Sequence, residues 1–389
     1  MTAPPSIRSD SYSVVAYGVM LGDDARVRAY ATALQNLITS KSFVIDIGTG
    51  AGTFALLACR LGARRVVGIE PDDVIELARE SAGDNGLADR VEFVQEISTL
   101  VAFDEPADVV VSDLRGVLPL YRQHIPSVID ARERLLSRTG ALIPREDRLL
   151  AAVVTDTSTY ERNLEGWRRW PEIDQARARR LSANALLGSR LQRESFVCNP
   201  MCWATLDYRT IEDANVTGTL DCVASRPATA HGVGLGFEAT LAEGASFSTL
   251  PSRPDAVYGN LLLPFEEPIE LVEGDRVSVD IRANLIGDDY IWRWETTAWR
   301  GNDSSSEIAR YSQSNLNAVP PSHLRRITPD HVPTLNEIGR CDALILARMA
   351  AGASLEQIAR EVSSQFPGLY QTWEDAWDHV AVLSSTYGR

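Results

Sequence analysis

The sequence predicts an α/β domain, followed by an antiparallel β domain and a small helical region. Apolar, β-branched runs alternate with helical patterns over the first third of the chain, which is typical of a parallel sheet covered by helices. Short strand-like runs separated by turn signals then extend from about Ser195 to Trp299. Roughly the last sixty residues repeat their apolar positions every 3.6 residues, as helices do. A chain of 389 residues exceeds what one core usually supports, so we expect several domains.

The first part of the chain has the element order of a doubly wound sheet. Asp23 or Asp24 can cap an early helix, because apolar residues recur on one face after them. Expected strands cover residues 42–47, 65–69, 91–94 and 107–112, and expected helices cover 53–61 and 72–85. The strands are short apolar runs, which indicates burial on both faces of the sheet.

Changes in pattern along the chain suggest the domain boundaries. We place an N-terminal helical segment at 1–40, the α/β domain at 41–144, the antiparallel β domain, a barrel or a sandwich, at 145–310, and a helical domain at 311–389. Residues 160–195 are arginine-rich and are expected to be helical. The polar, proline-containing stretch 301–322 is interpreted as a linker. Ser354 and Thr372 are expected to cap helices of the last domain.

The charge balance excludes several classes of partner. The net charge is -15, from 38 basic and 53 acidic residues, which disfavours nucleic-acid binding. No apolar run approaches the ~18 residues that a membrane span needs. The first residues lack a signal-peptide pattern, so we expect a cytoplasmic protein with no membrane partner.

Lysine and cysteine usage limits the chemistry. Lys41 is the only lysine, so the chain has no phosphate-binding GxxxxGK[ST] loop and only one residue for Schiff-base catalysis. The five cysteines form no CxxC pair, and no histidine lies near Cys198 and Cys202. We therefore expect free thiols and no metal site.

The strongest functional signal is the segment after the first strand. Gly48, Gly50 and Gly52 let the backbone turn tightly and approach a ligand, and Asp46 lies just before them. Glu70, at the end of the next strand, can accept two hydrogen bonds from a ribose diol. The short loop and the two acidic residues suit a cationic ligand without phosphate. S-adenosylmethionine fits that description, and the arrangement resembles the class I S-adenosylmethionine-dependent methyltransferases.

A more specific resemblance involves the helix before the first strand. Residues 20–30, MLGDDARVRAY, are similar to the ML-x-D-x-x-R-x-x-x-Y helix of the protein arginine methyltransferases. The resemblance covers about residues 12–310 and implies a Rossmann-like domain, a β-barrel and a helical dimerisation arm at 160–195, hence a homodimer. It implies that Arg26 binds the cofactor carboxylate. The cofactor-binding residues that we expect are Met20, Arg26, Asp46, Gly48, Gly50, Gly52, Glu70, Pro71, Glu96 and Ser98.

The chain departs from that family at the acceptor site. The family clamps a guanidinium between two acidic residues, and Asp113 takes the place of the first. Arg122 occupies the place of the second, and it would repel an arginine substrate. Residues 256–258, Ala-Val-Tyr, replace the Thr-His-Trp loop, and residues 17–19 replace a His-Glu-Glu segment. We therefore expect an oxygen or nitrogen acceptor on a peptide or secondary metabolite.

Asp113 is the first candidate to orient or deprotonate the acceptor, because it follows a parallel strand at the ligand-binding edge. It could instead cap the next helix. His124 is the second candidate base, although a histidine in a helix is more often structural. Arg115 or Arg122 could bind an acceptor carboxylate.

Two other functions remain open from the sequence. One is arginine methylation with a second acid from elsewhere, such as Glu295 or Asp104. The other is a non-catalytic scaffold for peptide recognition. Residues 333–388, with PTLNEIG, SLEQIA and FPG, are similar to the small winged-helix-like peptide-binding domain of pyrroloquinoline-quinone biosynthesis. That similarity implies a peptide acceptor, whereas the same helices could simply stabilise the fold.

Overall fold

The computed structural model describes residues 12–301, 303–318 and 332–388. The chain divides into a large compact unit, Ser13–Pro320, and a small unit that contains Pro321–Arg389. Among the described residues, no helix combines the length and the apolar character that crossing a bilayer requires.

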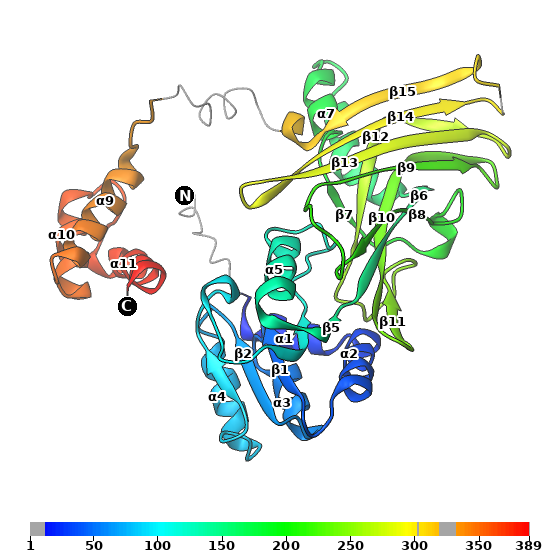
Figure 1. Cartoon of the computed structure of the whole chain (residues 1–389). Coiled ribbons are helices and arrows are strands. Elements are labelled where there is room, and N and C mark those ends of the chain that lie inside the picture. The colour runs from blue at the N-terminus through cyan, green and yellow to red at the C-terminus, as the bar shows by residue number, and fades with distance from the viewer. Residues whose placement is uncertain (1–11, 302, 319–331, 389) are drawn as a thin grey trace. The chain divides into compact units, whose positions relative to one another are not determined.

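A five-stranded parallel sheet forms the first half of the large unit (Figure 1). Its strand order is β3-β2-β1-β4-β5, so β1 is central and pairs with β2 and β4. The strands are β1 Phe43–Ile47, β2 Arg65–Ile69, β3 Glu92–Val94, β4 Ala107–Ser112 and β5 Leu136–Ile143. The helices are α1 Val14–Leu21, α2 Asp24–Leu37, α3 Thr53–Arg60, α4 Ile75–Asp84 and α5 His124–Asp130, which continues into a π-helical turn, Ala131–Leu135. This α/β domain is confirmed, and Asp23 is the cap of α2.

Two antiparallel sheets form the second half of the large unit. The larger has the order β7-β12-β10-β6-β8 with β11 paired to β10, and the smaller has the order β15-β14-β13-β9. Their strands are β6 Glu146–Val154, β7 Leu187–Ser189, β8 Met201–Asp207, β9 Val216–Val223, β10 Ala228–Ala242, β11 Ala245–Ser248, β12 Asn260–Leu271, β13 Arg276–Ile286, β14 Asp289–Trp299 and β15 Glu307–Ser314. In the described chain no ladder joins the two sheets into a closed barrel. Trp292 and Trp294 are buried core residues, and Trp292 contacts the Trp203 ring of β8.

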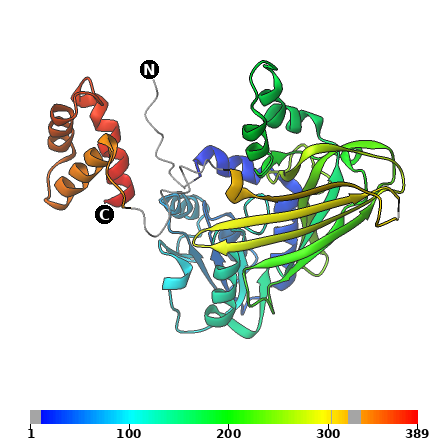
Figure 2. The ribbon, with the colours of Figure 1, turned by 90° about the horizontal axis from the view of Figure 1, so that it is seen from above.

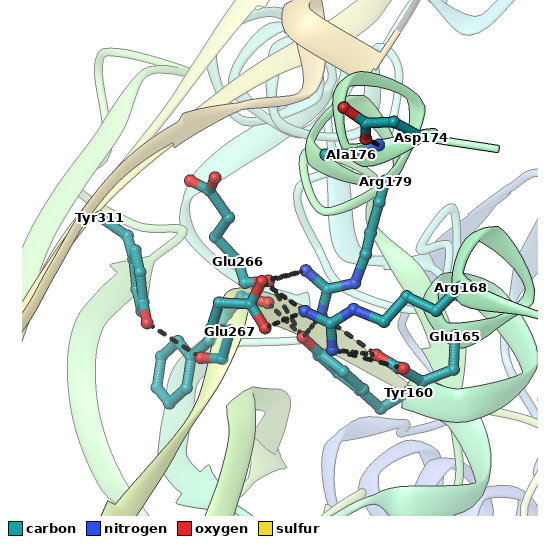
Figure 3. A network of polar contacts seen from close by, with 10 residues as sticks. Tyr160, Glu165, Arg168, Asp174, Ala176, Arg179, Glu266, Glu267 and Tyr311 are labelled. Carbon is teal, nitrogen blue, oxygen red and sulfur yellow. Dashed lines mark hydrogen bonds and ion pairs between the residues drawn. The ribbon is translucent and has the colours of Figure 1, made fainter. Parts of the chain in front are cut away.

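The segment expected to be a helical arm projects from the antiparallel sheets (Figures 1 and 2). It contains α6 Thr157–Leu164, a 3₁₀ turn Glu165–Arg168 and α7 Ala176–Ser182. Arg179, almost fully buried, donates to Glu267, to the Glu266 carbonyl and to the Tyr160 hydroxyl at 2.7–2.8 Å, and Arg168 binds Glu267 through both carboxylate oxygens (Figure 3). The arm is therefore fixed to β12 by charged hydrogen bonds.

Two expectations about this half were wrong. Within the 160–195 segment, Leu187–Ser189 form strand β7 rather than helix, and this strand pairs with the start of β12. The proposed linker 301–322 contains β15, which pairs with β14 along its length. β15 is polar because it is an edge strand with one face toward solvent, so its sequence resembles a linker.

The small unit is helical, as expected. Within residues 332–388 the helices are α9 Glu337–Ala350, α10 Leu355–Gln365 and α11 Trp373–Tyr387, and this range contains no strand. Ser354 with Gln357, and Thr372 with Asp375, form capping boxes at α10 and α11. Its core consists of eight buried residues: Cys341, Ile345, Ile358, Ala359, Val362, Ala376, Val380 and Leu383.

Candidate functional site

The turn after β1 requires glycine at three positions. Gly48, Gly50 and Gly52 have φ angles of 71°, 53° and 83°, a left-handed region that other residues rarely adopt. A Cβ atom on Gly50 would lie 2.5 Å from the ring of Tyr17, so α1 lies directly against the turn. The turn therefore presents bare backbone at the carboxyl edge of the parallel sheet, where open α/β sheets bind ligands.

The Glu70 carboxylate lies beneath this turn at the end of β2. It accepts hydrogen bonds from the backbone N–H groups of Gly50, at 3.0 Å, and Asp72, at 3.2 Å. Burial raises the pKa of Glu70, and the two N–H donors oppose that shift. Each carboxylate oxygen keeps a free lone pair for a further donor.

Asp46 is a second buried carboxyl group at the same edge. It accepts from the Thr49 hydroxyl at 2.6 Å and from the Ala55 N–H at 3.1 Å. Burial raises the pKa of Asp46 to about 7. The folded protein therefore holds this proton between about pH 4 and pH 7, and the stability that Asp46 contributes is lost as the pH rises through that range. A cation bound at the turn would favour the ionised form.

Arg26, on α2, connects the N-terminal helices to Asp113 at the carboxyl edge of the parallel sheet. One guanidinium nitrogen donates to Asp113 at 2.5 Å, and another donates to the Met20 carbonyl at 2.6 Å. The Arg26 Nε atom is buried and has no hydrogen-bond partner among the described residues. An unpaired buried donor of this kind is uncommon and suggests a site for an acceptor group.

Asp113 follows β4 and accepts hydrogen bonds from three side chains. Besides Arg26, Arg115 donates to it at 2.9 Å and the Tyr258 hydroxyl at 2.6 Å. Burial would raise the pKa of Asp113, but the Arg115 and Arg26 guanidiniums lower it more, so its pKa lies below the usual value. Asp113 is therefore an ionised hydrogen-bond acceptor at neutral pH. The next helix begins at His124, so Asp113 is not a helix cap.

A buried network of hydrogen bonds extends from Asp113 into the antiparallel sheets. Arg115 binds Asp147 of β6 through two hydrogen bonds of 2.8 Å, and both side chains are fully buried. The Tyr208 hydroxyl donates to Asp147 at 2.6 Å and so accepts from His124 Nε2 at 2.9 Å. Burial, together with the Arg115 charge, lowers the pKa of His124 to about 3, so the ring is neutral. Arg115 also donates to the Tyr30 hydroxyl, which completes this network.

Comparisons with known proteins find similarity to methyltransferases. Residues 26–143 match the family described as ribosomal protein L11 methyltransferase (PrmA). A probable protein arginine N-methyltransferase 6 from Arabidopsis thaliana is 33% identical over 158 residues, which are 40% of this chain and 36% of the relative. Protein arginine N-methyltransferase 1 from Dictyostelium discoideum is 23% identical over 280 residues, 69% of this chain and 82% of the relative.

A solved structure, the Trypanosoma brucei PRMT1 enzyme–prozyme heterotetrameric complex with AdoHcy, has a TM-score of 0.71 at 22% identity. It covers 78% of this chain and 98% of that chain. The chain resembles the protein arginine methyltransferases. The structural likeness establishes an arginine methyltransferase-like fold, and the chain spans little more than a third of the length of the Arabidopsis relative.

Within this arginine methyltransferase-like fold, most of the candidate residues lie at one edge. The turn, Asp46, Glu70, Arg26 and Asp113 are all at the carboxyl ends of β1, β2 and β4. Pro71 and Glu96 are exposed, and Ser98 is buried. Glu96 bonds the N–H of Ile97, and Arg134 donates to the Ser98 carbonyl. Arg115 and His124 lie behind Asp113 rather than beside the turn.

Sequence reasoning did not identify Asp147 and Tyr208 as part of the site. They come from β6 and from the residue after β8, and they meet Arg115 only because the two halves of the unit pack together. Tyr258 was noticed only as a departure from the family pattern. Its hydroxyl donates to Asp113, which connects the loop before β12 to the site.

The acids suggested as a second carboxylate do not join this network. Asp104 binds Arg65 at the start of β2, at the opposite end of the parallel strands. Glu295 is half-exposed on β14 and pairs with Arg293. Arg122 has a positive φ of 43°, unusual for a residue other than glycine, and its guanidinium lies over the Tyr121 ring.

Proposed function

We propose that the chain transfers a methyl group from S-adenosylmethionine to a nitrogen or oxygen atom of a peptide or secondary metabolite. The central observation is the glycine turn with the Glu70 carboxylate bound beneath it. When bound, S-adenosylmethionine supplies a methyl carbon that is electrophilic because it is attached to a sulfonium. The chain itself would position this donor and the acceptor for an in-line displacement.

The residues at the carboxyl edge of the parallel sheet fit S-adenosylmethionine. The free lone pairs of Glu70 suit the two hydroxyls of a ribose. The unpaired Nε atom of Arg26 suits the carboxylate of the methionine part. Asp46, whose burial disfavours its charge, gains a counter-ion if a cation occupies the turn. Roles for the remaining candidates Met20, Pro71, Glu96 and Ser98 stay predictions.

Asp113 would act on the acceptor as a hydrogen-bond acceptor rather than as a strong base. Its lowered pKa makes it a weak proton acceptor, whereas its charge stabilises positive charge that develops on an attacking nitrogen or hydroxyl. Arg115 is fully buried against Asp147, so we assign it a positioning role for Asp113 instead of a contact with an acceptor carboxylate. His124 is neutral and hydrogen-bonded to Tyr208, so it belongs to the same buried hydrogen-bond network.

Arginine methylation is the second candidate, and it is favoured by the relatives. The described contacts leave no unpaired carboxylate at the acceptor end of the site, since Asp113 binds Arg26 and Arg115, and Asp147 binds Arg115. A guanidinium clamp needs two, and Arg122 stands where the resemblance places the second. We therefore favour an acceptor other than arginine.

A methyl-transfer assay separates the candidates. The full chain is incubated with methyl-labelled S-adenosylmethionine and a diverse peptide library, and the acid-hydrolysed products are analysed. Label on residues other than arginine supports the proposal, and methylarginine supports the second candidate. If the chain binds the donor yet labels no peptide or metabolite extract, a non-catalytic scaffold is the better reading.

We also propose that the arm joins two copies of the chain in a homodimer. Trp170 and Ile173 on the arm are more than 60% exposed, and α1 buries none of its apolar residues. Exposed apolar surfaces of this kind are typical of protein–protein interfaces. Trp170→Glu combined with Ile173→Glu is expected to convert a dimer to a monomer in analytical ultracentrifugation. Ile286→Glu, at an equally exposed apolar position on β13, should leave the dimer intact. A monomeric wild-type chain would contradict the idea.

A further inference from the structure

The small unit brings together three metal-ligand side chains of different chemistry. Cys341 and Asp342 lie on α9 and His379 lies on α11. One ligand atom from each, a sulfur, an oxygen and a nitrogen, lies within 4.8 Å of the other two. His379 Nε2 is 2.9 Å from Asp342 Oδ1. That separation is close to the edge of a zinc coordination tetrahedron, roughly 3.3 Å for bonds of about 2.0–2.1 Å.

The neighbouring hydroxyl orients the histidine. His379 Nδ1 is hydrogen-bonded to the Tyr370 hydroxyl, which also lies 3.4 Å from Cys341 Sγ. With Nδ1 engaged in this way, Nε2 is the atom that faces Asp342. Metal-binding histidines usually have their second nitrogen held by such a partner, which fixes the ring and the tautomer. Tyr370 is thus placed to support both the thiol and the imidazole.

The size of the unit gives a physical reason for a metal. Residues 332–388 bury only the eight residues of their core, several of them small. Domains of this length obtain only a few kcal/mol of stability from one apolar core, roughly 3–5 kcal/mol, and a structural metal is one of the devices that add to it. The three ligands come from α9 and α11, the first and last of the helices described in residues 332–388, so an ion would join these two helices.

We propose that Cys341, Asp342 and His379 bind a zinc ion that joins α9 to α11. Zinc is of borderline softness and accepts thiolate, imidazole and carboxylate ligands together, whereas magnesium and calcium prefer oxygen alone. Water would complete a four-coordinate site, because the Asp342 side chain is 34% exposed. The sequence did not suggest this site, since its ligands are distant along the chain and form no CxxC motif. The proposal is independent of methyl transfer.

Metal binding is tested on the untagged full-length chain after removal of metals with a chelator. Titration with Zn²⁺ should give one tightly bound ion per chain by elemental analysis. Titration with Co²⁺ should give the near-ultraviolet charge-transfer band of a thiolate–cobalt bond and the visible bands of tetrahedral cobalt. Zn²⁺ should also raise the unfolding temperature of the small unit.

Variants test the ligand assignment. Cys341→Ser should abolish the charge-transfer band, and Asp342→Asn should weaken Zn²⁺ binding at least about 10-fold. Because Cys341 is buried, a folding defect in its variant is checked by circular dichroism, and Asp342, whose side chain is about one-third exposed, provides the second variant. Cys202→Ser, in β8 of the other unit, is the matched control and should bind like the wild type. Absence of Zn²⁺ binding, or a charge-transfer band that survives in Cys341→Ser, would overturn the proposal.

Discussion

Replacing Asp147 with alanine is expected to destabilise the large unit by about 3–5 kcal/mol, because it leaves the buried Arg115 charge without its partner. The two hydrogen bonds between Arg115 and Asp147 would be lost, and the Tyr208 hydroxyl would lose its acceptor. Asp147→Asn should be less severe, since the amide oxygen still accepts one hydrogen bond. The measurement is chemical denaturation followed by tryptophan fluorescence.

Asp221→Ala is the matched control for this prediction. Asp221 also lies on a strand and pairs with an arginine, Arg276, but both side chains are about half exposed. Exposed ion pairs contribute about 0–1 kcal/mol, so this variant should unfold almost like the wild type. Equal stability losses for Asp147→Ala and Asp221→Ala would mean that the buried hydrogen-bond network does not hold the two halves of the large unit together.

Asp113→Asn is expected to lower the rate of methyl transfer by about 100-fold or more, the typical effect of removing a group that stabilises developing charge. The asparagine keeps the shape of the side chain but removes the negative charge that faces Arg26, Arg115 and Tyr258. Because the pKa of Asp113 lies below its usual value, activity should not fall with pH until well into the acid range. The assay is kcat and KM with labelled donor.

Asp108→Asn provides the comparison. Asp108 belongs to the same strand, β4, but its carboxylate accepts from the Phe43 N–H at the opposite end of the sheet. Its variant should keep nearly full activity, and thermal unfolding of both variants separates a catalytic loss from misfolding. A folded Asp113→Asn protein with wild-type kcat would exclude Asp113 from the acceptor site.

Local patterns predicted the parallel sheet well. β1, β2 and β4 are apolar, β-branched runs buried on both faces, and each was expected within a residue of its observed bounds. β15 was missed because an edge strand with a solvent-facing side needs few apolar residues. β7 was missed because its three residues are too few to show a period.

The candidate site was only partly predictable. The turn, Glu70 and Asp113 follow strands, so their meeting at one edge follows from parallel strand order. The pairing of Arg115 with Asp147, and the contact of Tyr258 with Asp113, depend on how the antiparallel sheets pack on the α/β domain. No sequence pattern specifies such long-range contacts, which is why Arg115 was expected to face an acceptor.

Calorimetric titration with S-adenosylhomocysteine tests most directly whether the glycine turn is a donor site. We expect binding at one site per chain, weakened in Glu70→Ala by about 1.5–3 kcal/mol for the lost charged hydrogen bonds. Glu76→Ala, an exposed acid on α4 paired with Arg79, should bind like the wild type. No heat and no thermal shift with the wild-type chain, or unchanged affinity in Glu70→Ala, would show that the glycine turn with Glu70 is not the donor site.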